Sequence, residues 1–122
     1  MHRLTAKEEE IMSIFWEKGP KFIKEIHESY PEPRPHYNTL STIVRGLEEK
    51  GFVGYTVFGN THRYYALVSN EKYRRFTLKN VVARYFDNSY RHAVSSLIEE
   101  EVLSIDELKA LIRQVKSQNR KK

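Results

Sequence analysis

The sequence predicts a mostly α-helical protein with one small β-hairpin. Three amphipathic helical patterns come first, and a run rich in aromatic and β-branched residues follows them. Further helical patterns fill the rest of the 122 residues. The sequence therefore divides into an N-terminal domain over residues 1–69 and a three-helix domain with a basic tail over residues 70–122.

Composition excludes several classes of protein. No run approaches the roughly 18 apolar residues that a membrane-spanning helix needs, and the N-terminus lacks the apolar segment of a secretory signal. The chain has no cysteine, which excludes disulfides, iron–sulfur ligation and thiolate zinc sites. We therefore expect a cytoplasmic protein.

The net charge of +5 is distributed unevenly. Basic and acidic residues balance over residues 1–69, so the excess lies in residues 70–122. The stretch from Pro33 to Asn70 nevertheless has only two acids, Glu48 and Glu49. Such acid-poor basic stretches suit contacts with phosphates, although a solvated surface would explain them as well.

The first three helices are expected near residues 5–18, 22–30 and 37–50. Thr5 and Glu8 have the spacing of a capping box, and Gly19-Pro20 ends the first helix. The third helix shows one apolar face, formed by Leu40, Ile43, Val44 and Leu47. At about 100° per residue, its opposite face carries Asn38, Thr42, Arg45 and Glu49.

A hairpin and three helices complete the prediction. Strands over residues 52–58 and 63–68 flank a polar tip at residues 59–62. Helices follow over about 70–86 and 90–101, and Ser104 with Glu107 forms a capping box for the last one. Residues 117–122 are expected to be a frayed basic tail.

Three helices followed by a hairpin form the plan of a winged helix-turn-helix. In such proteins the third helix enters the DNA major groove, and the hairpin is the wing. The predicted contacts from this recognition helix are Tyr37, Asn38, Thr39, Ser41, Thr42 and Arg45. The predicted contacts from the wing are Asn60, His62 and Arg63. For any single residue of these sets, simple solvation of a polar surface is the alternative.

The last three helices carry more apolar residues than isolated short helices could hide. Two interleaved copies would bury them, and a two-fold dimer would also read two half-sites on DNA. The predicted interface comprises Leu78, Val81, Val82, Tyr85, Leu97, Leu108, Leu111, Ile112 and Val115. Packing of these helices back onto the N-terminal domain is the alternative.

Enzymatic and metal-dependent functions find no support. The five histidines form no ligand-spaced cluster, and no glycine-rich loop has the pattern of a phosphate cradle. We expect no catalysis, no cofactor and no metal. A winged-helix module that binds another protein and has no role on DNA is the second functional hypothesis.

An ordered set of segments resembles the penicillinase repressor family, the BlaI and MecI regulators. The segments are LTAKEEEIMSIFW (4–16), KEI (24–26), YNTLSTI (37–43), LEEKGFV (47–53), YYALVS (64–69) and LSIDEL (103–108). The resemblance implies a dimeric repressor that binds dyad operators on double-stranded DNA through a winged helix. It also implies a membrane sensor of the metalloprotease type, whose signal leads to cleavage in the dimerisation domain. The bond aligned with the family's cleaved bond is Ser96–Leu97.

The sequence departs from the family pattern at several positions. Gly46 stands where members often carry Arg, Phe22 where they often carry Thr, and Gly59-Asn60 where the wing usually has Gly-Arg. The absence of cysteine separates the chain from the family's copper-responsive branch.

Overall fold

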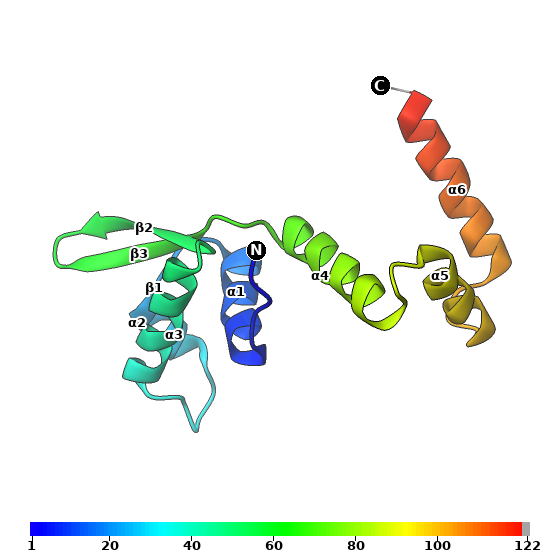
Figure 1. The fold of residues 1–122 in the computed structure, drawn as a ribbon. Helices are drawn as coiled ribbons and strands as arrows, with labels where there is room; N and C mark the ends of the chain where they lie inside the picture. The colour runs from blue at the N-terminus through cyan, green and yellow to red at the C-terminus, as the bar shows by residue number, and fades with distance from the viewer. Residues whose placement is uncertain (121–122) are drawn as a thin grey trace. The chain divides into compact units, whose positions relative to one another are not determined.

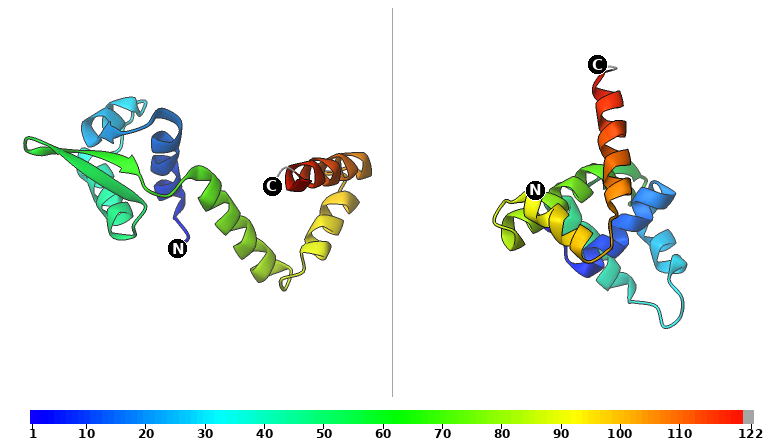
Figure 2. Two further views of the ribbon diagram at one scale, coloured as in Figure 1. Left: turned by 90° about the horizontal axis from the view of Figure 1, so that it is seen from above. Right: turned by 90° about the vertical axis from the view of Figure 1, so that its right-hand side faces the viewer.

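The computed structural model describes residues 1–120 and confirms the predicted fold class: helices with a small antiparallel sheet (Figures 1 and 2). The chain forms two compact units, Met1–Thr77 and a second unit that begins at Leu78. In order, the described elements are α1 (Ala6–Lys18), β1 (Lys21–Phe22), α2 (Ile23–Ser29), α3 (Tyr37–Glu49), β2 (Val53–Phe58), β3 (Thr61–Ala66), α4 (Asn70–Tyr85), α5 (Tyr90–Glu99) and α6 (Ile105–Arg120).

The capping box at the start of α1 is confirmed. The Thr5 N–H donates to Glu8 Oε1 at 2.9 Å, and the Glu8 N–H donates to Thr5 Oγ1 at 3.2 Å. At the other end, the Gly19 N–H donates to the Phe15 carbonyl, and Gly19 takes a φ of 81° that ends the helix. These two signals fix both ends of α1.

One face of α3 is completely buried in the first unit. Leu40, Val44 and Leu47 are each no more than 1% exposed, as the helical spacing predicts. They belong to a hydrophobic core that includes Ile11, Met12, Phe15, Ile26, Phe52 and Val53. Burial of this face leaves the other sides of α3 facing outward.

An ion pair joins the start of α1 to the end of α3. Lys50 Nζ donates to both Glu8 carboxylate oxygens, at 3.0 and 2.8 Å, and Glu8 is only 8% exposed. Burial acts to raise the pKa of Glu8. Hydrogen bonds from Lys50 and from the Thr5 backbone outweigh that effect, so the pKa lies below its usual value. The pair therefore ties the C-terminal end of α3 to α1.

The sheet differs from the predicted two-stranded hairpin in two ways. β3 pairs with β2 on one side and with the short strand β1 on the other, at Lys21↔Tyr64 and Phe22↔Arg63. The predicted tip at residues 59–62 is too long, because Thr61 and His62 already pair with Phe58 and Val57. The turn is Gly59-Asn60, with Gly59 at φ 61° as a two-residue turn of this kind requires.

The first part of α4 belongs to the first unit, so the predicted boundary at residues 69/70 lies eight residues before the observed division. Ser69 Oγ accepts from the Lys72 N–H and begins the helix, as its sequence suggests. Tyr73 is 4% exposed, accepts from the Leu4 N–H at 2.9 Å and donates to Glu9 Oε1 at 3.0 Å. These hydrogen bonds hold α4 against the N-terminal segment.

In the second unit, side-chain caps begin α5 and α6. Ser89 Oγ accepts from the His92 N–H, and the Ser104–Glu107 capping box is confirmed in both directions. α6 continues to Arg120, so the predicted fraying from Ser117 is wrong through residue 120. The last two residues of that predicted tail lie outside the described residues.

Over residues 1–120, none of the helices combines the length and apolar character that crossing a membrane would require.

Replacing Gly46 of α3 should raise the free energy of unfolding. A Cβ at this position would meet Glu8 Oε2 at 4.0 Å, which is an ordinary contact. Gly46→Ala should therefore stabilise the protein by about 0.5–1 kcal/mol, because Ala loses less backbone entropy on folding. Urea unfolding followed by circular dichroism measures the change.

Gly54→Ala is the matched control for this substitution. A Cβ at Gly54 would lie 2.9 Å from Tyr65 Oη and 3.0 Å from Cζ, so the ring would have to move. This variant should unfold at lower urea than the parent protein. Equal losses of stability in the two alanine variants would contradict the account.

Candidate nucleic-acid interface

The predicted recognition residues lie on α3 and mostly face outward. Tyr37, Asn38, Thr39, Thr42 and Arg45 are exposed, and Ser41 is half-buried. Five of these six form two rows along the helix, because residues four apart share a face. Thr39 belongs to neither row and lies beside Ile11 and Tyr30 instead. One row is Tyr37–Ser41–Arg45, and the other begins with Asn38–Thr42. The Thr42 hydroxyl donates to the Asn38 carbonyl at 2.9 Å, so its single O–H donor is already used within the helix.

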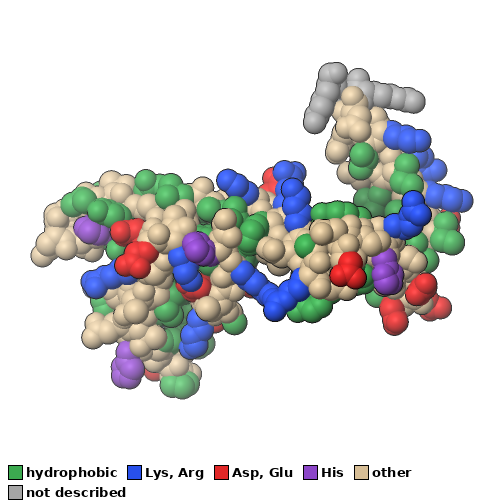
Figure 3. All heavy atoms as spheres, viewed as in Figure 1, with side chains coloured by type: hydrophobic (Ala, Val, Ile, Leu, Met, Phe, Trp, Pro, Cys, Tyr) green, Lys and Arg blue, Asp and Glu red, His purple; other side chains and the backbone are tan. Residues whose placement is uncertain are grey.

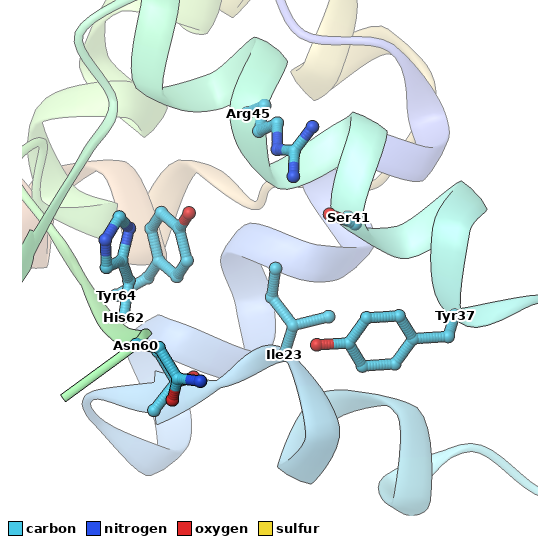
Figure 4. Close-up of a pocket in the computed structure, with 8 residues that line it drawn as sticks. Ile23, Tyr37, Ser41, Arg45, Asn60, His62 and Tyr64 are labelled. Atoms are coloured by element: carbon cyan, nitrogen blue, oxygen red, sulfur yellow. The ribbon is translucent and has the colours of Figure 1, made fainter. Parts of the chain in front are cut away.

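A polar cavity of about 210 Å³ separates the first of these rows from the wing (Figure 4). Tyr37, Ser41 and Arg45 line it from α3, and Ile23 lines it from the first residue of α2. The hairpin supplies the remaining lining residues, which are Asn60, Thr61, His62 and Tyr64. The structure thus brings three predicted recognition residues and two predicted wing residues to one site.

Tyr64 connects this cavity to the core. The residue is 5% exposed, and its burial raises the pKa of its phenol. The nearby Glu48 charge raises this pKa further, whereas the Arg45 charge lowers it. The side chains of Glu48 and Arg45 thus both lie near this phenol. The three ion pairs between described residues are Arg34–Glu32, Lys50–Glu8 and Arg75–Glu71, and Arg45 takes part in none of them.

The predicted wing residues do not all lie together. His62 stacks on Tyr55, with ring centroids 4.2 Å apart and 8° between the planes, on the side that faces α3. Arg63 is the next residue in β3 and points to the opposite face of the sheet. Its guanidinium lies over the Phe58 ring, 5.0 Å from the centroid, and Phe58 also contacts Phe22 edge-on.

Apolar side chains also reach the surface of the wing. Hydrophobic groups gather over the hairpin in the space-filling view (Figure 3). Val57 is 59% exposed, and Phe58 is 44% exposed.

Reasoning from sequence did not assign Thr61 or Tyr64 to the site. The alternation of β3 could have found Tyr64, because it shares a face with His62.

The predicted dimer-interface residues divide by exposure. Val82 is 2% exposed and so is buried within its own chain, and Val81 and Leu108 are half-buried. The other six are open to solvent by 45% or more: Leu78, Tyr85, Leu97, Leu111, Ile112 and Val115. α5 and α6 also border an apolar hollow of about 510 Å³ that Val94, Ile98 and Leu108 line. The second unit thus exposes a large apolar surface.

The predicted cleavage bond lies inside helix α5. Ser96 is half-buried, and its hydroxyl donates to the His92 carbonyl at 3.0 Å, whereas Leu97 is exposed. The Leu97 carbonyl accepts from the N–H groups of Val102 and Leu103, just beyond the helix. A protease could reach this bond only after the end of α5 unwinds locally.

No group of three or more His, Asp or Glu side chains is arranged to hold a metal ion within residues 1–120.

A helix-turn-helix with a polar outward face, followed by a β wing, is the architecture of winged-helix DNA-binding proteins. Residues 4–117 match the family model described as penicillinase repressor. The chain belongs to this family of transcriptional repressors, as its sequence motifs predict.

Curated relatives are methicillin resistance regulatory proteins named MecI. The chain is 27% identical over 111 residues to the protein from Mammaliicoccus sciuri, with 90% of each chain covered. It is 26% identical, with the same coverage, to the proteins from Staphylococcus aureus strain N315 and Staphylococcus epidermidis.

Proposed function

We propose that this repressor binds a dyad operator as a homodimer and blocks transcription of the adjacent genes in the cytoplasm. The observation that carries the proposal is the site between α3 and the wing, where three recognition-helix residues and two wing residues meet. Both elements would contact one stretch of duplex, with α3 in the major groove and the wing beside the backbone.

Base recognition is assigned to the row that begins with Asn38 and Thr42. The Asn38 amide can pair with adenine through two hydrogen bonds, and the Thr42 methyl can touch a thymine methyl. Both side chains are exposed on α3. Their helix is fixed from behind by the buried Leu40, Val44 and Leu47, so they would reach the bases from a rigid support.

Dimerisation is assigned to the apolar surface of the second unit. Leu111, Ile112 and Val115 lie on one side of α6 and are 46–52% exposed. An exposed apolar stripe of this kind marks an interaction surface in soluble proteins. A second copy would cover it and would hold two winged helices at the spacing of two half-sites.

Release from DNA is assigned to proteolysis at or near Ser96–Leu97. A cut there would separate α6 from the rest of the chain and would remove part of the proposed dimer interface. Monomers would lose the gain in affinity that two linked half-site contacts provide. A membrane sensor of the metalloprotease type, answering β-lactam or another stress, is the proposed source of the signal.

Loss of Asn38 and Thr42 side chains should remove sequence preference. Asn38→Ala should cost about 1–3 kcal/mol of binding to the DNA upstream of the protein's own gene, and Thr42→Ala, which loses a single apolar contact, should cost less. Binding to a random duplex of equal length should persist, because phosphate contacts supply it. Fluorescence anisotropy with both duplexes measures the ratio of the affinity for the upstream DNA to the affinity for the random duplex.

Glu49→Ala is the control in this series, because Glu49 is also exposed on α3 but lies at its far end. It should keep the sequence preference. Equal binding of both duplexes by the parent protein would instead favour the protein–protein module as its function.

A charge in the apolar stripe of α6 should separate the dimer. Leu111→Asp should give a monomer in sedimentation equilibrium at micromolar concentration, because the carboxylate would lose its hydration in the interface. Ser117→Asp adds the same charge on the polar side of α6 and should remain dimeric. A parent protein that sediments as a monomer would exclude this interface.

Inducer should produce a chain cut within α5. Mass spectrometry of repressor recovered from induced cells should find fragments that end at or near Ser96. Ser96→Pro should increase cutting, because proline removes the N–H that donates within the helix and so favours local unwinding. An intact chain in fully induced cells would contradict control by proteolysis.

A further inference from the structure

Arg45 faces the wing, and this placement gives it a different task from Asn38 and Thr42. Arg45 lies eight residues after Tyr37 and four after Ser41, so it ends the row that lines the cavity. In Figure 4, Arg45 and Ser41 extend from α3 into the space that His62 and Tyr64 border from β3. The recognition helix therefore presents two chemically distinct rows.

The cavity has the chemistry of an oxyanion site. Arg45 offers guanidinium donors from α3, and Ser41 adds a hydroxyl. Across from them, Asn60 and His62 offer an amide and an imidazole. No carboxylate is among the lining residues, and Arg45 has no ion-pair partner among the described residues. A negatively charged group would complete this set of donors.

The size of the cavity limits what that group can be. Sites for drug-sized ligands typically measure about 300–1,000 Å³, whereas this cavity measures about 210 Å³. It has room for one compact anion, such as a single phosphate group. An organic effector of ordinary size would not be enclosed.

We propose that this cavity receives one backbone phosphate of the DNA and that Arg45 is its principal ligand. The inference rests on the proposed operator binding and deepens it. A phosphate held from α3 and from the wing at once would fix the depth of the helix in the groove. Asn38 and Thr42 would then read bases, whereas Arg45 would position the protein without reading sequence.

Arg45→Gln separates these two roles, because a phosphate contact and a base contact leave different signatures. The variant should bind the upstream fragment and the random duplex more weakly by a similar factor, about tenfold. The slope of log K against log salt should become shallower by about 0.9, the value for one phosphate contact. The ratio of the affinities for the two duplexes should remain the same as in the parent protein.

Two further variants test the other side of the cavity and control for the loss of charge. His62→Gln removes the imidazole from the wing side of the cavity and should also weaken binding to both duplexes by the same factor. Arg113→Gln makes the same change as Arg45→Gln at an exposed residue of α6, and it should leave the slope unchanged. Both Arg variants remove one positive charge, so a change of slope in Arg45→Gln alone would come from the lost contact and not from the lower net charge.

Inorganic phosphate distinguishes DNA from a free anion as the source of the group. At matched ionic strength, phosphate should release DNA from the parent protein better than chloride does, because it would compete with the DNA backbone for the cavity, and this difference should disappear in Arg45→Gln. Phosphate that binds the parent protein without releasing DNA would show that the cavity holds a free oxyanion and would overturn the assignment to DNA.

Other outcomes bear on the two proposals separately. An unchanged slope for Arg45→Gln would overturn the phosphate assignment, as would a loss confined to the upstream fragment, which would make Arg45 a base reader. Absence of any preference in the parent protein would instead overturn the proposed function, and this inference with it.

Discussion

Burial of one face of α3 is the constraint on which the rest of the first unit depends. Leu40, Val44 and Leu47 are almost fully excluded from solvent, so the rotation of the helix about its own axis is fixed. Two polar rows must then face outward, one toward the wing and one away from it. The Lys50–Glu8 ion pair sets the C-terminal end of the same helix. Packing on the buried side of α3 thus makes the two outward rows a rigid surface.

The two units use apolar surface in opposite ways. The first unit buries most large apolar side chains of its helices in one core and exposes polar rows on α3, and Val57 and Phe58 are exposed on the wing. The second unit leaves apolar side chains such as Leu111 and Val115 about half exposed. Burial of apolar surface is the main favourable term in association. The contrast explains why we assign DNA to the first unit and a second copy of the chain to the second.

Periodic and local signals were readable from the sequence, whereas contacts between distant residues were not. The buried face of α3 follows from its helical spacing, and the caps at Thr5, Ser69 and Ser104 follow from short motifs. β1 has only two residues and so has no period to detect. His62 and Arg63 lie on opposite faces of the sheet because β3 already begins at Thr61, and the sequence did not fix that start. The different roles of Arg45 and of Asn38 and Thr42 could not be read from the sequence, because they depend on where the wing lies relative to α3.

Footprinting of the DNA upstream of the protein's own gene tests the central claim most directly. Cleavage by hydroxyl radicals reports each protected backbone position at single-nucleotide resolution. The account predicts two equivalent protected patches, related by a two-fold axis, whose centres lie about one helical turn of 10–10.5 base pairs, or a multiple of it, apart. A single patch without symmetry, or uniform weak protection along the fragment, would contradict a dimeric operator-binding repressor.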